Sequence, residues 1–469
     1  MLLGLDLGTG SCKAVLMLED GAVVRSASRV YAVNSLYDGW AESEPLAWLE
    51  AIGEASRAVV QGAVVRAIGL SGQMHGLVLT DSSGAALRPA MLWSDTRSQA
   101  QLEVYNRLSS AMLEQLGNPI VTGMMGLSLL WLKSHEPALL DSSRWALLPK
   151  DWLRWQLTGD VHSDPSDASG TLLYDVQRDD WAHNLLETLG LPEILPPLQS
   201  SSAIAGYVTS SAAALLGVQA GVPVATGGGD TPCAMLGNGI LKTGVAQLSV
   251  GTGAQIVAPR DSALSDSSFR THLYRSVTGN WYAMAAMQNA GLALERVRGW
   301  LGLDWDGFYA AAFSQPDSSG LIFKPYLSGE RTPHMNAALR GSFQHLGLHH
   351  TQAHLARAAL EGVAFSISDG LGALRAAGVE VTALRLAGGG TLQTPWRQLL
   401  SDALGVPLLT GGAPDASARG AAFLAGLSIG VYSDPLETAG LLPAPELVAT
   451  PAPSAVLLEA LGMFRALRI

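Results

Sequence analysis

The chain has 469 residues, which is too many for one ordinary hydrophobic core, so two domains are expected. Hydrophobic residues make up 48% of the sequence and charged residues 15%, a balance that excludes a disordered chain. The net charge of −11, without any cluster of Lys and Arg, argues against a nucleic-acid partner.

The cysteines and the start of the chain bear on its compartment. Cys12 and Cys233 are too few for a disulfide framework or a thiolate zinc site, and their apolar neighbours predict that both are buried. No apolar run of about 18 residues occurs, and residues 1–6 lack the basic start of a signal peptide. We therefore expect a cytoplasmic protein without a membrane partner.

The first half opens on a predicted hairpin. Residues 2–6 and 12–18 have the pattern of strands, and the turn between them contains Gly8-Thr9-Gly10. The other elements expected in this half are a strand at 22–30, a helix after residue 45, strands at 66–70 and 77–80, and mixed helices and loops over 97–216.

A second strand–turn–strand unit, residues 246–258, resembles the first and contains Gly251-Thr252-Gly253. Internal duplication is one explanation and chance is the other, because short glycine matches are common. The other elements expected are strands near 281–287, 321–324 and 381–387, and helices from 351, near 395–404, at 416–430 and at 453–466. Helices and strands in both halves predict the α/β class.

Between the halves, an apolar run ends in Gly227-Gly228-Gly229, and Asp230 follows. Asp is a good N-cap residue, so one interpretation of Asp230 is the cap of a helix. The other is a carboxylate that accepts a proton beside a glycine floor, where no Cβ keeps a ligand from the backbone. Spacing alone favours the cap, so the rest of the chain has to decide.

The paired glycine turns suggest a phosphate site. The backbone N–H groups of such a turn point into one concavity that binds anions, and two turns face to face could hold a nucleotide's phosphates. The usual phosphate-binding motifs, GxxxxGK[ST] and GxGxxG, are absent from the sequence. Asp6 precedes the first turn, and Mg²⁺ prefers one or two carboxylates together with phosphate oxygens. Purely structural turns remain the alternative for either hairpin alone.

Longer motifs carry a resemblance to a known family. They are residues 4–9 (GLDLGT), 72–76 (GQMHG), 92–97 (LWSDTR), 148–151 (LPKD), 163–171 (SDPSDASGT), 228–230 (GGD), 249–253 (SVGTG), 326–333 (YLSGERTP), 347–361 and 388–390 (GGG). Through them the chain resembles the FGGY carbohydrate kinases over nearly its whole length, and within them those that act on xylulose. The 73–75 and 327–333 motifs are specific, whereas the glycine runs are not.

The resemblance implies two actin-like (ribonuclease-H-like) domains, residues 1–239 and 240–469, with sugar and ATP in the cleft between them. It implies that Asp230 takes the proton from the sugar hydroxyl that attacks ATP, and that Asp6 and Asp230 hold Mg²⁺. Substrate contacts are implied for Met74, His75, Trp93, Arg97, Asp230 and Thr231. Nucleotide contacts are implied for Gly8, Thr9, Gly10, Gly251, Thr252, Gly253, Gly388, Gly389 and Gly390. The expected reaction is phosphorylation of a pentulose, first of all D-xylulose to D-xylulose 5-phosphate, and the family suggests a homodimer.

Two positions depart from the family pattern. Thr231 stands where the xylulose-phosphorylating members carry Asn, which leaves the identity of the pentulose open. Ser128 stands where a lysine is usual, and we have no functional account of that change. The alternatives are a kinase for D-ribulose, L-xylulose or glycerol, a non-metabolic actin-like ATPase, and a sugar-binding regulator that has lost catalysis.

Some candidate residues also have structural interpretations. His75 could be an ordinary loop histidine, Trp93 a core aromatic, and Glu330 with Arg331 an ion pair that holds a loop. A metal is suggested by the spacing of His345, His349, His350 and His354. We do not expect one, because a helix that begins near Thr351 cannot bring all four onto one face.

Overall fold

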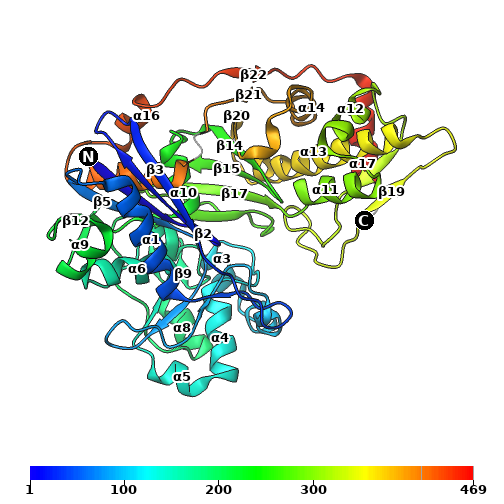
Figure 1. Cartoon of the computed structure of the whole chain (residues 1–469). Coiled ribbons are helices and arrows are strands. Elements are labelled where there is room, and N and C mark those ends of the chain that lie inside the picture. The colour runs from blue at the N-terminus through cyan, green and yellow to red at the C-terminus, as the bar shows by residue number, and fades with distance from the viewer. Residues whose placement is uncertain (413–414, 468–469) are drawn as a thin grey trace.

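The computed structural model describes residues 1–412 and 415–467, so residues 413, 414, 468 and 469 of the expected second domain lie outside the described part. Two main sheets divide the chain near Asp230 (Figure 1). The first contains, in spatial order, β11 (Ile204–Tyr207), β12 (Pro223–Ala225), β5 (Ala67–Gly72), β1 (Leu2–Leu7), β2 (Ser11–Met17) and β3 (Val23–Val30), and β13 (Gly228–Gly229) also pairs with β5. The second contains, in spatial order, β16 (His272–Arg275), β17 (Trp281–Met287), β15 (Ala254–Arg260), β14 (Gly244–Val250), β20 (Val381–Ala387), β21 (Leu408–Leu409) and β22 (Leu447–Ala449).

The two sheets share a topology around their glycine turns. β1 pairs antiparallel with β2 and parallel with β5. In the same way, β14 pairs antiparallel with β15 and parallel with β20. The predicted α/β class is therefore confirmed, and the resemblance between the two GTG hairpins extends to their place in the sheet.

Helices cover both faces of the first sheet. α1 (Pro45–Val60) packs on the face that presents Leu3 and Leu5, whereas α15 (Ala416–Ser428) packs on the face that presents Leu2 and Val15. Neighbouring residues of a strand point to opposite faces, so α1 and α15 lie on opposite sides. A helix from the second half of the chain thus completes the core of the first half.

The helix that carries Asp230, α10 (Asp230–Gly237), packs closely on α15. A Cβ at Gly237 would lie 2.0 Å from the Ala416 carbonyl oxygen, and a Cβ at Gly420 would lie 1.9 Å from the Cys233 carbonyl oxygen. Only glycine permits this approach of two backbones. The position of α10 is therefore set by direct backbone contact with the second half of the chain.

The second sheet is covered on one face by helices of its own half, on the right of Figure 1. They are α11 (Gly291–Trp300), α12 (Trp305–Phe313), α13 (Gln352–Ala376), α14 (Thr394–Leu404) and α17 (Ala455–Ala466). Its other face, with Val257, Tyr282 and Met284, shares a hydrophobic core with Met74 and Met124 of the first half. The halves therefore meet through a continuous apolar core.

The remaining elements of the first half include a helical region at the bottom of Figure 1. Its helices are α4 (Met125–His135), α5 (Pro137–Ser142) and α8 (His183–Leu189). Shorter elements elsewhere in this half are β4 (Glu42–Ser43), β6 (Val78–Thr80), β7 (Ala90–Met91), η1 (Arg97–Gln101), α2 (Leu102–Asn106), α3 (Ser110–Leu116), β8 (Trp145–Leu147), α6 (Pro149–Thr158), α7 (Pro165–Ala168), β9 (Tyr174–Asp175), β10 (Asp180–Trp181) and α9 (Ser210–Leu216). Those of the second half are β18 (Ile322–Lys324), β19 (Ser342–Gln344), η2 (Gly389–Thr391) and α16 (Pro435–Gly440).

Most predicted elements are confirmed. The strands expected at 2–6, 12–18 and 22–30 are β1, β2 and β3, and the helix expected from residue 351 is α13. Cys12 and Cys233 are buried free thiols, as predicted. Within residues 1–412 and 415–467, no helix has both the length and the apolar character needed to cross a membrane.

Candidate active site

A cavity of about 180 Å³ between the two halves gathers most of the predicted substrate residues. Met74, His75, Trp93, Asp230 and Thr231 all line it, together with Thr9 of the first glycine turn. The second half contributes Gln255, His272, Tyr274, Met284 and Arg331. Residues from both halves therefore enclose one space, which is a common location for a ligand.

Asp230 is the first residue of α10, and Gly229 is the N-cap. The interpretation of Asp230 as the cap is therefore wrong. Its Oδ1 accepts hydrogen bonds from the Thr231 amide at 2.6 Å and the Thr231 hydroxyl at 3.2 Å, while the side chain lines the cavity. Burial and the nearby charge of Asp6 raise the pKa of Asp230 to about 7, which suits a group that accepts a proton at neutral pH.

Asp6 lies on β1, next to the first glycine turn. The Ser71 hydroxyl donates to its Oδ1 at 2.9 Å, and burial raises the pKa of Asp6. Two neighbouring carboxylates disfavour each other's charged forms, and a bound cation would relieve that repulsion. Mg²⁺ takes one or two protein carboxylates when phosphate oxygens and water complete its shell, so Asp6 and Asp230 fit this metal.

The raised pKa of Asp230 predicts a pH-dependent stability. The ordinary pKa of 3.8 in the unfolded chain rises to about 7 in the folded one, so the folded state binds more protons between these values. The stability that the protonated Asp230 side chain contributes is fully present at low pH and is lost as the pH rises toward 7. Asp230→Asn removes this loss, so the metal-free variant should unfold at a higher temperature than wild type at pH 8. The difference should shrink toward pH 5 in thermal scans with EDTA.

Asp81→Asn provides a control in which the expected change in stability at pH 8 has the opposite sign. Asp81 lies on an exposed turn, where hydrogen bonds from Ser83 lower its pKa. A lowered pKa contributes stability above the unfolded value, so this variant should be less stable than wild type at pH 8. A gain for Asp230→Asn that is equal at pH 5 and pH 8 would contradict the proposed environment of Asp230.

His75 is a neutral hydrogen-bonding group in the cavity wall. Its Nδ1 lies 2.6 Å from the carbonyl oxygen of Gly170, and a carbonyl only accepts, so Nδ1 carries the hydrogen. Burial lowers the pKa of His75 to about 4, which leaves Nε2 as an acceptor at neutral pH. The backbone of His75 has φ of 75°, a left-handed value that is costly for a residue other than glycine. This geometry presents His75 to the cavity.

Trp93 forms the wall between the cavity and the first glycine turn. Its side chain is 39% exposed, so the interpretation as a core aromatic is wrong. The indole Nε1 donates to Thr9 Oγ1 at 2.8 Å, which fixes the ring beside the turn. An exposed aromatic face at a polar cavity suits the apolar face of a sugar.

Arg97 is a correction to the predicted substrate contacts. Its side chain is 1% exposed, and Nη2 lies 2.6 Å from Asp95 and 2.8 Å from Glu42. The guanidinium also covers the Trp40 ring at 3.4 Å from its centroid. Two carboxylates and an indole therefore hold Arg97 away from the cavity, and it does not belong to the lining residues.

Arg331 is a lining residue that the sequence interpretation missed. The alternative ion pair with Glu330 is not formed in the described part of the chain; Glu330 Oε1 accepts instead from the backbone amides of Gln288 at 2.5 Å and Arg331 at 2.8 Å. Arg331 instead contributes charge beside His75 and His272 and helps to lower the pKa of both. Its membership of the 326–333 motif was an available signal, whereas nothing in the pattern marked His272.

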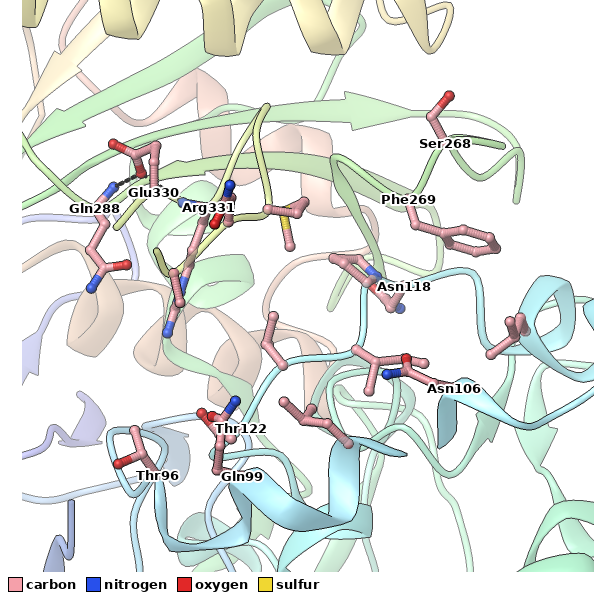
Figure 2. A pocket seen from close by; sticks show the side chains of 18 of the residues that line it. Thr96, Gln99, Asn106, Asn118, Thr122, Ser268, Phe269, Gln288, Glu330 and Arg331 are labelled. Carbon is pink, nitrogen blue, oxygen red and sulfur yellow. Dashed lines mark hydrogen bonds between the residues drawn. The ribbon is translucent and has the colours of Figure 1, made fainter. Parts of the chain in front are cut away.

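A larger cavity of about 580 Å³ adjoins the first and shares Val121, Thr122 and Arg331 with it. Figure 2 shows residues of the first half, such as Gln99, facing residues of the second half, such as Phe269, across this space. The smaller cavity is the one that Asp230, the candidate base, lines. The larger cavity continues the smaller one between the two halves.

The glycines expected to bind nucleotide fall into two groups. The turn Gly8-Thr9-Gly10 adjoins the cavity through Thr9, and Gln73 Nε2 donates to the Gly8 carbonyl at 3.2 Å. In the second half, Cβ atoms at Gly388 and Gly390 would lie 2.9 Å and 2.6 Å from the Val250 carbonyl oxygen. Residues 388–390 therefore pack directly against the strand that leads into the turn at 251–253.

Two of the four histidines considered as metal ligands are engaged in local hydrogen bonds. His350 Nδ1 accepts from the Gly347 amide at 2.8 Å, and His354 Nδ1 accepts from the Thr351 amide at 3.1 Å. The described ranges 1–412 and 415–467 contain no group of three or more His, Cys, Asp or Glu that could hold a metal. These two nitrogens bind backbone amides in the loop that leads into α13.

Comparison with known proteins agrees with this geometry. The N-terminal domain model of the FGGY family of carbohydrate kinases matches residues 1–237, and the C-terminal domain model matches residues 246–429. The chain belongs to this family. A xylulose kinase of Klebsiella pneumoniae is 36% identical over 453 residues, which cover 94% of this chain and 92% of that protein.

Solved structures of the family share the fold. A xyloylose kinase from Brucella ovis superposes with a TM-score of 0.92 at 34% identity, covering 99% of this chain and 98% of its own. A gluconate kinase from Lactobacillus acidophilus superposes with a TM-score of 0.94 at 25% identity, covering 99% of this chain and 96% of its own. The expected fold of two actin-like domains is therefore confirmed.

Proposed function

We propose that the protein transfers the γ-phosphate of ATP to a pentulose, namely to the C5 hydroxyl of D-xylulose. The observation that carries the proposal is the carboxylate of Asp230 in a cavity shared with His75 and Trp93. The relatives described as xylulose kinases support the choice of sugar. Thr231 replaces the usual Asn next to Asp230, so D-ribulose and L-xylulose are the first competitors.

In the proposed reaction, Asp230 removes the proton of the attacking hydroxyl. His75 Nε2 accepts from another hydroxyl of the sugar, and the Trp93 ring covers an apolar face. Phosphoryl transfer depends mainly on alignment and on neutralisation of charge, which these fixed groups assist. Mg²⁺, which Asp6 and Asp230 would hold, supplies positive charge to the phosphates. Closure of the halves around the cavity would exclude water as a competing acceptor.

We assign the nucleotide to the glycine turns. The Gly8 and Gly251 amides donate within their own turns, to the Ser11 and Gly253 carbonyls, which leaves the amides at positions 9–10 and 252–253 for phosphate oxygens. Residues 388–390 lie beside the second turn. We place the boundary between a sugar domain and a nucleotide domain at residues 239 and 240. A cytoplasmic homodimer is part of the same proposal, and sedimentation of the purified protein tests the dimer.

The experiment is a coupled assay of ADP formation against a panel of acceptors. D-xylulose should give the highest kcat/KM, at least about tenfold above D-ribulose, L-xylulose, gluconate and glycerol, because differences in hydroxyl contacts are worth more than differences in apolar contacts. Absence of turnover with every pentulose would overturn the substrate. ATP hydrolysis that is equally fast without any acceptor would favour the actin-like ATPase instead.

A further inference from the structure

A fully buried cluster of charged side chains lies behind the glycine run that precedes Asp230. Lys150 Nζ lies 2.5 Å from Asp151 Oδ1, 3.0 Å from Asp164 Oδ1 and 3.6 Å from Asp167 Oδ2, and all these side chains are 0% exposed. Arg154 Nη1 lies 3.0 Å from Asp151 Oδ1 and is equally buried. The desolvation of so many charges is repaid only where their geometry is good and further hydrogen bonds satisfy them, so the partners of the cluster outside its own ion pairs matter.

Two arms of this cluster hold the two ends of the glycine run. Arg154 Nη1 donates to the Thr226 carbonyl at 2.8 Å, immediately before the glycines. At the other end, the Gly229 amide donates to Ser166 Oγ at 3.1 Å, and the same hydroxyl donates to Asp164 Oδ2 at 2.5 Å. The segment between Thr226 and Asp230 is therefore tied to one rigid ionic centre.

The glycine run needs such an external support. Its residues have no side chains to pack, and Gly227 has φ of 81°, so the segment has wide conformational freedom of its own. Ser166 also packs closely on the run, because a Cβ at Gly228 would lie 2.8 Å from its Oγ, with Val277 Cγ1 on the same Cβ at 2.2 Å. Asp230 follows directly after this run, so this support helps to determine where its carboxylate lies, together with the pairing of β13 with β5 and the contact of α10 with α15.

We propose that Ser166 is a positioning residue that connects the buried Lys150–Asp164 pair to the Gly229 amide and so fixes Asp230 against the attacking hydroxyl. The inference rests on the proposed function, in which Asp230 is the base. It also assigns a role to the 148–151 and 163–171 motifs, whose charged residues do not line the cavity. A displacement of about 1 Å in a reacting group can cost about 100-fold in rate.

Ser201 provides a matched control. Its hydroxyl donates to the same Asp164 Oδ2 at 2.7 Å, and its side chain is also buried. Its contact with the glycine run is made by the backbone carbonyl, which accepts from the Gly227 amide at 2.9 Å and persists in an alanine variant. Ser166→Ala and Ser201→Ala therefore each remove one hydrogen bond to Asp164, and only the first also releases Gly229.

The experiment compares both variants with wild type and with Asp230→Asn, using the best acceptor of the panel. We expect Ser166→Ala to lower kcat by about 10- to 100-fold with KM within about threefold, and Ser201→Ala to stay within about threefold of wild type in both. Thermal scans should show a loss of stability for both variants, larger for Ser166→Ala because it also leaves the Gly229 amide without its acceptor. Ser166→Cys, which keeps a weak sulfur donor and acceptor, should recover part of kcat.

Hydrogen exchange supplies a measurement that does not depend on turnover. The amides of residues 226–231 should exchange faster in Ser166→Ala than in Ser201→Ala, because only the first leaves the Gly229 amide without its acceptor. Equal kcat and equal exchange in the two serine variants would overturn the positioning role. Full activity of Asp230→Asn would instead overturn the base assignment, so the two failures are distinguishable. If Ser166→Ala does not fold, kcat and hydrogen exchange of Ser166→Cys are compared with those of Ser201→Ala in the same way.

Discussion

Asp230→Asn is expected to lower kcat for pentulose phosphorylation by about 10²- to 10⁴-fold, the usual contribution of a general base. The amide has nearly the same shape and its Oδ1 can still accept from the Thr231 amide, but it cannot take a proton. Because this contribution is made in the transition state, KM for the sugar should change by less than about tenfold. ADP formation at saturating ATP and sugar measures the effect.

The matched control for this variant is Asp304→Asn. Asp304 is also an aspartate at the start of a helix, and its Oδ1 accepts from the Gly307 amide at 2.7 Å. It lies on the surface outside the cavity, so its variant should keep kcat within about twofold of wild type. Equal losses in the two variants would mean that Asp230 matters only as a helix-start residue, and the base assignment would fail.

Asp6→Asn is expected to lower kcat by about 100-fold or more and to raise the Mg²⁺ concentration for half-maximal activity by at least about tenfold. The change removes one of the two negative charges that suit the metal, while Ser71 can still donate to the remaining oxygen. Activity measured over a titration of Mg²⁺ at fixed ATP gives both quantities.

Asp415→Asn tests whether any negative charge near the first glycine turn has the same effect. Asp415 lies 3.0 Å from Lys13 Nζ, and its charge contributes to the raised pKa of Asp6. It is not one of the two carboxylates assigned to Mg²⁺, so its variant should shift the Mg²⁺ requirement by less than about threefold. An Mg²⁺ titration of Asp6→Asn that matches wild type would remove Asp6 from the metal site.

Local signals were enough to predict much of the fold. Alternating apolar residues and the Gly8-Thr9-Gly10 turn predicted the first hairpin, and the apolar stripe from residue 351 predicted α13. The crossing of α15 onto the first sheet was not predictable in this way. That contact depends on glycines such as Gly4 and Gly69, whose partners lie in α15, at the other end of the chain.

Residues of the candidate site were predictable where they belong to a motif, and residues outside the motifs were not. The Gln73-Met74-His75 loop led to a residue that does line the cavity, whereas Tyr274 lies in a strand with no distinguishing pattern. A motif also cannot decide which partner a charged side chain takes. Arg97 lies within a matching segment, yet its guanidinium forms ion pairs with Asp95 and Glu42 and does not reach the cavity.

Spacing also misled the interpretation of Asp230 as a helix cap. The glycines before it supply the cap through Gly229, so the carboxylate begins the helix and faces the cavity. A shift of one residue separates the two outcomes, and sequence-based boundaries are not accurate to one residue.

The most direct test is a crystal structure with D-xylulose and a non-hydrolysable ATP analogue bound together with Mg²⁺. The account predicts the C5 hydroxyl of the sugar within about 2.6–3.2 Å of an Asp230 carboxylate oxygen, on the side that faces the γ-phosphate. A sugar bound outside the cavity of His75 and Trp93, or a C5 hydroxyl that faces a different side chain, would contradict it.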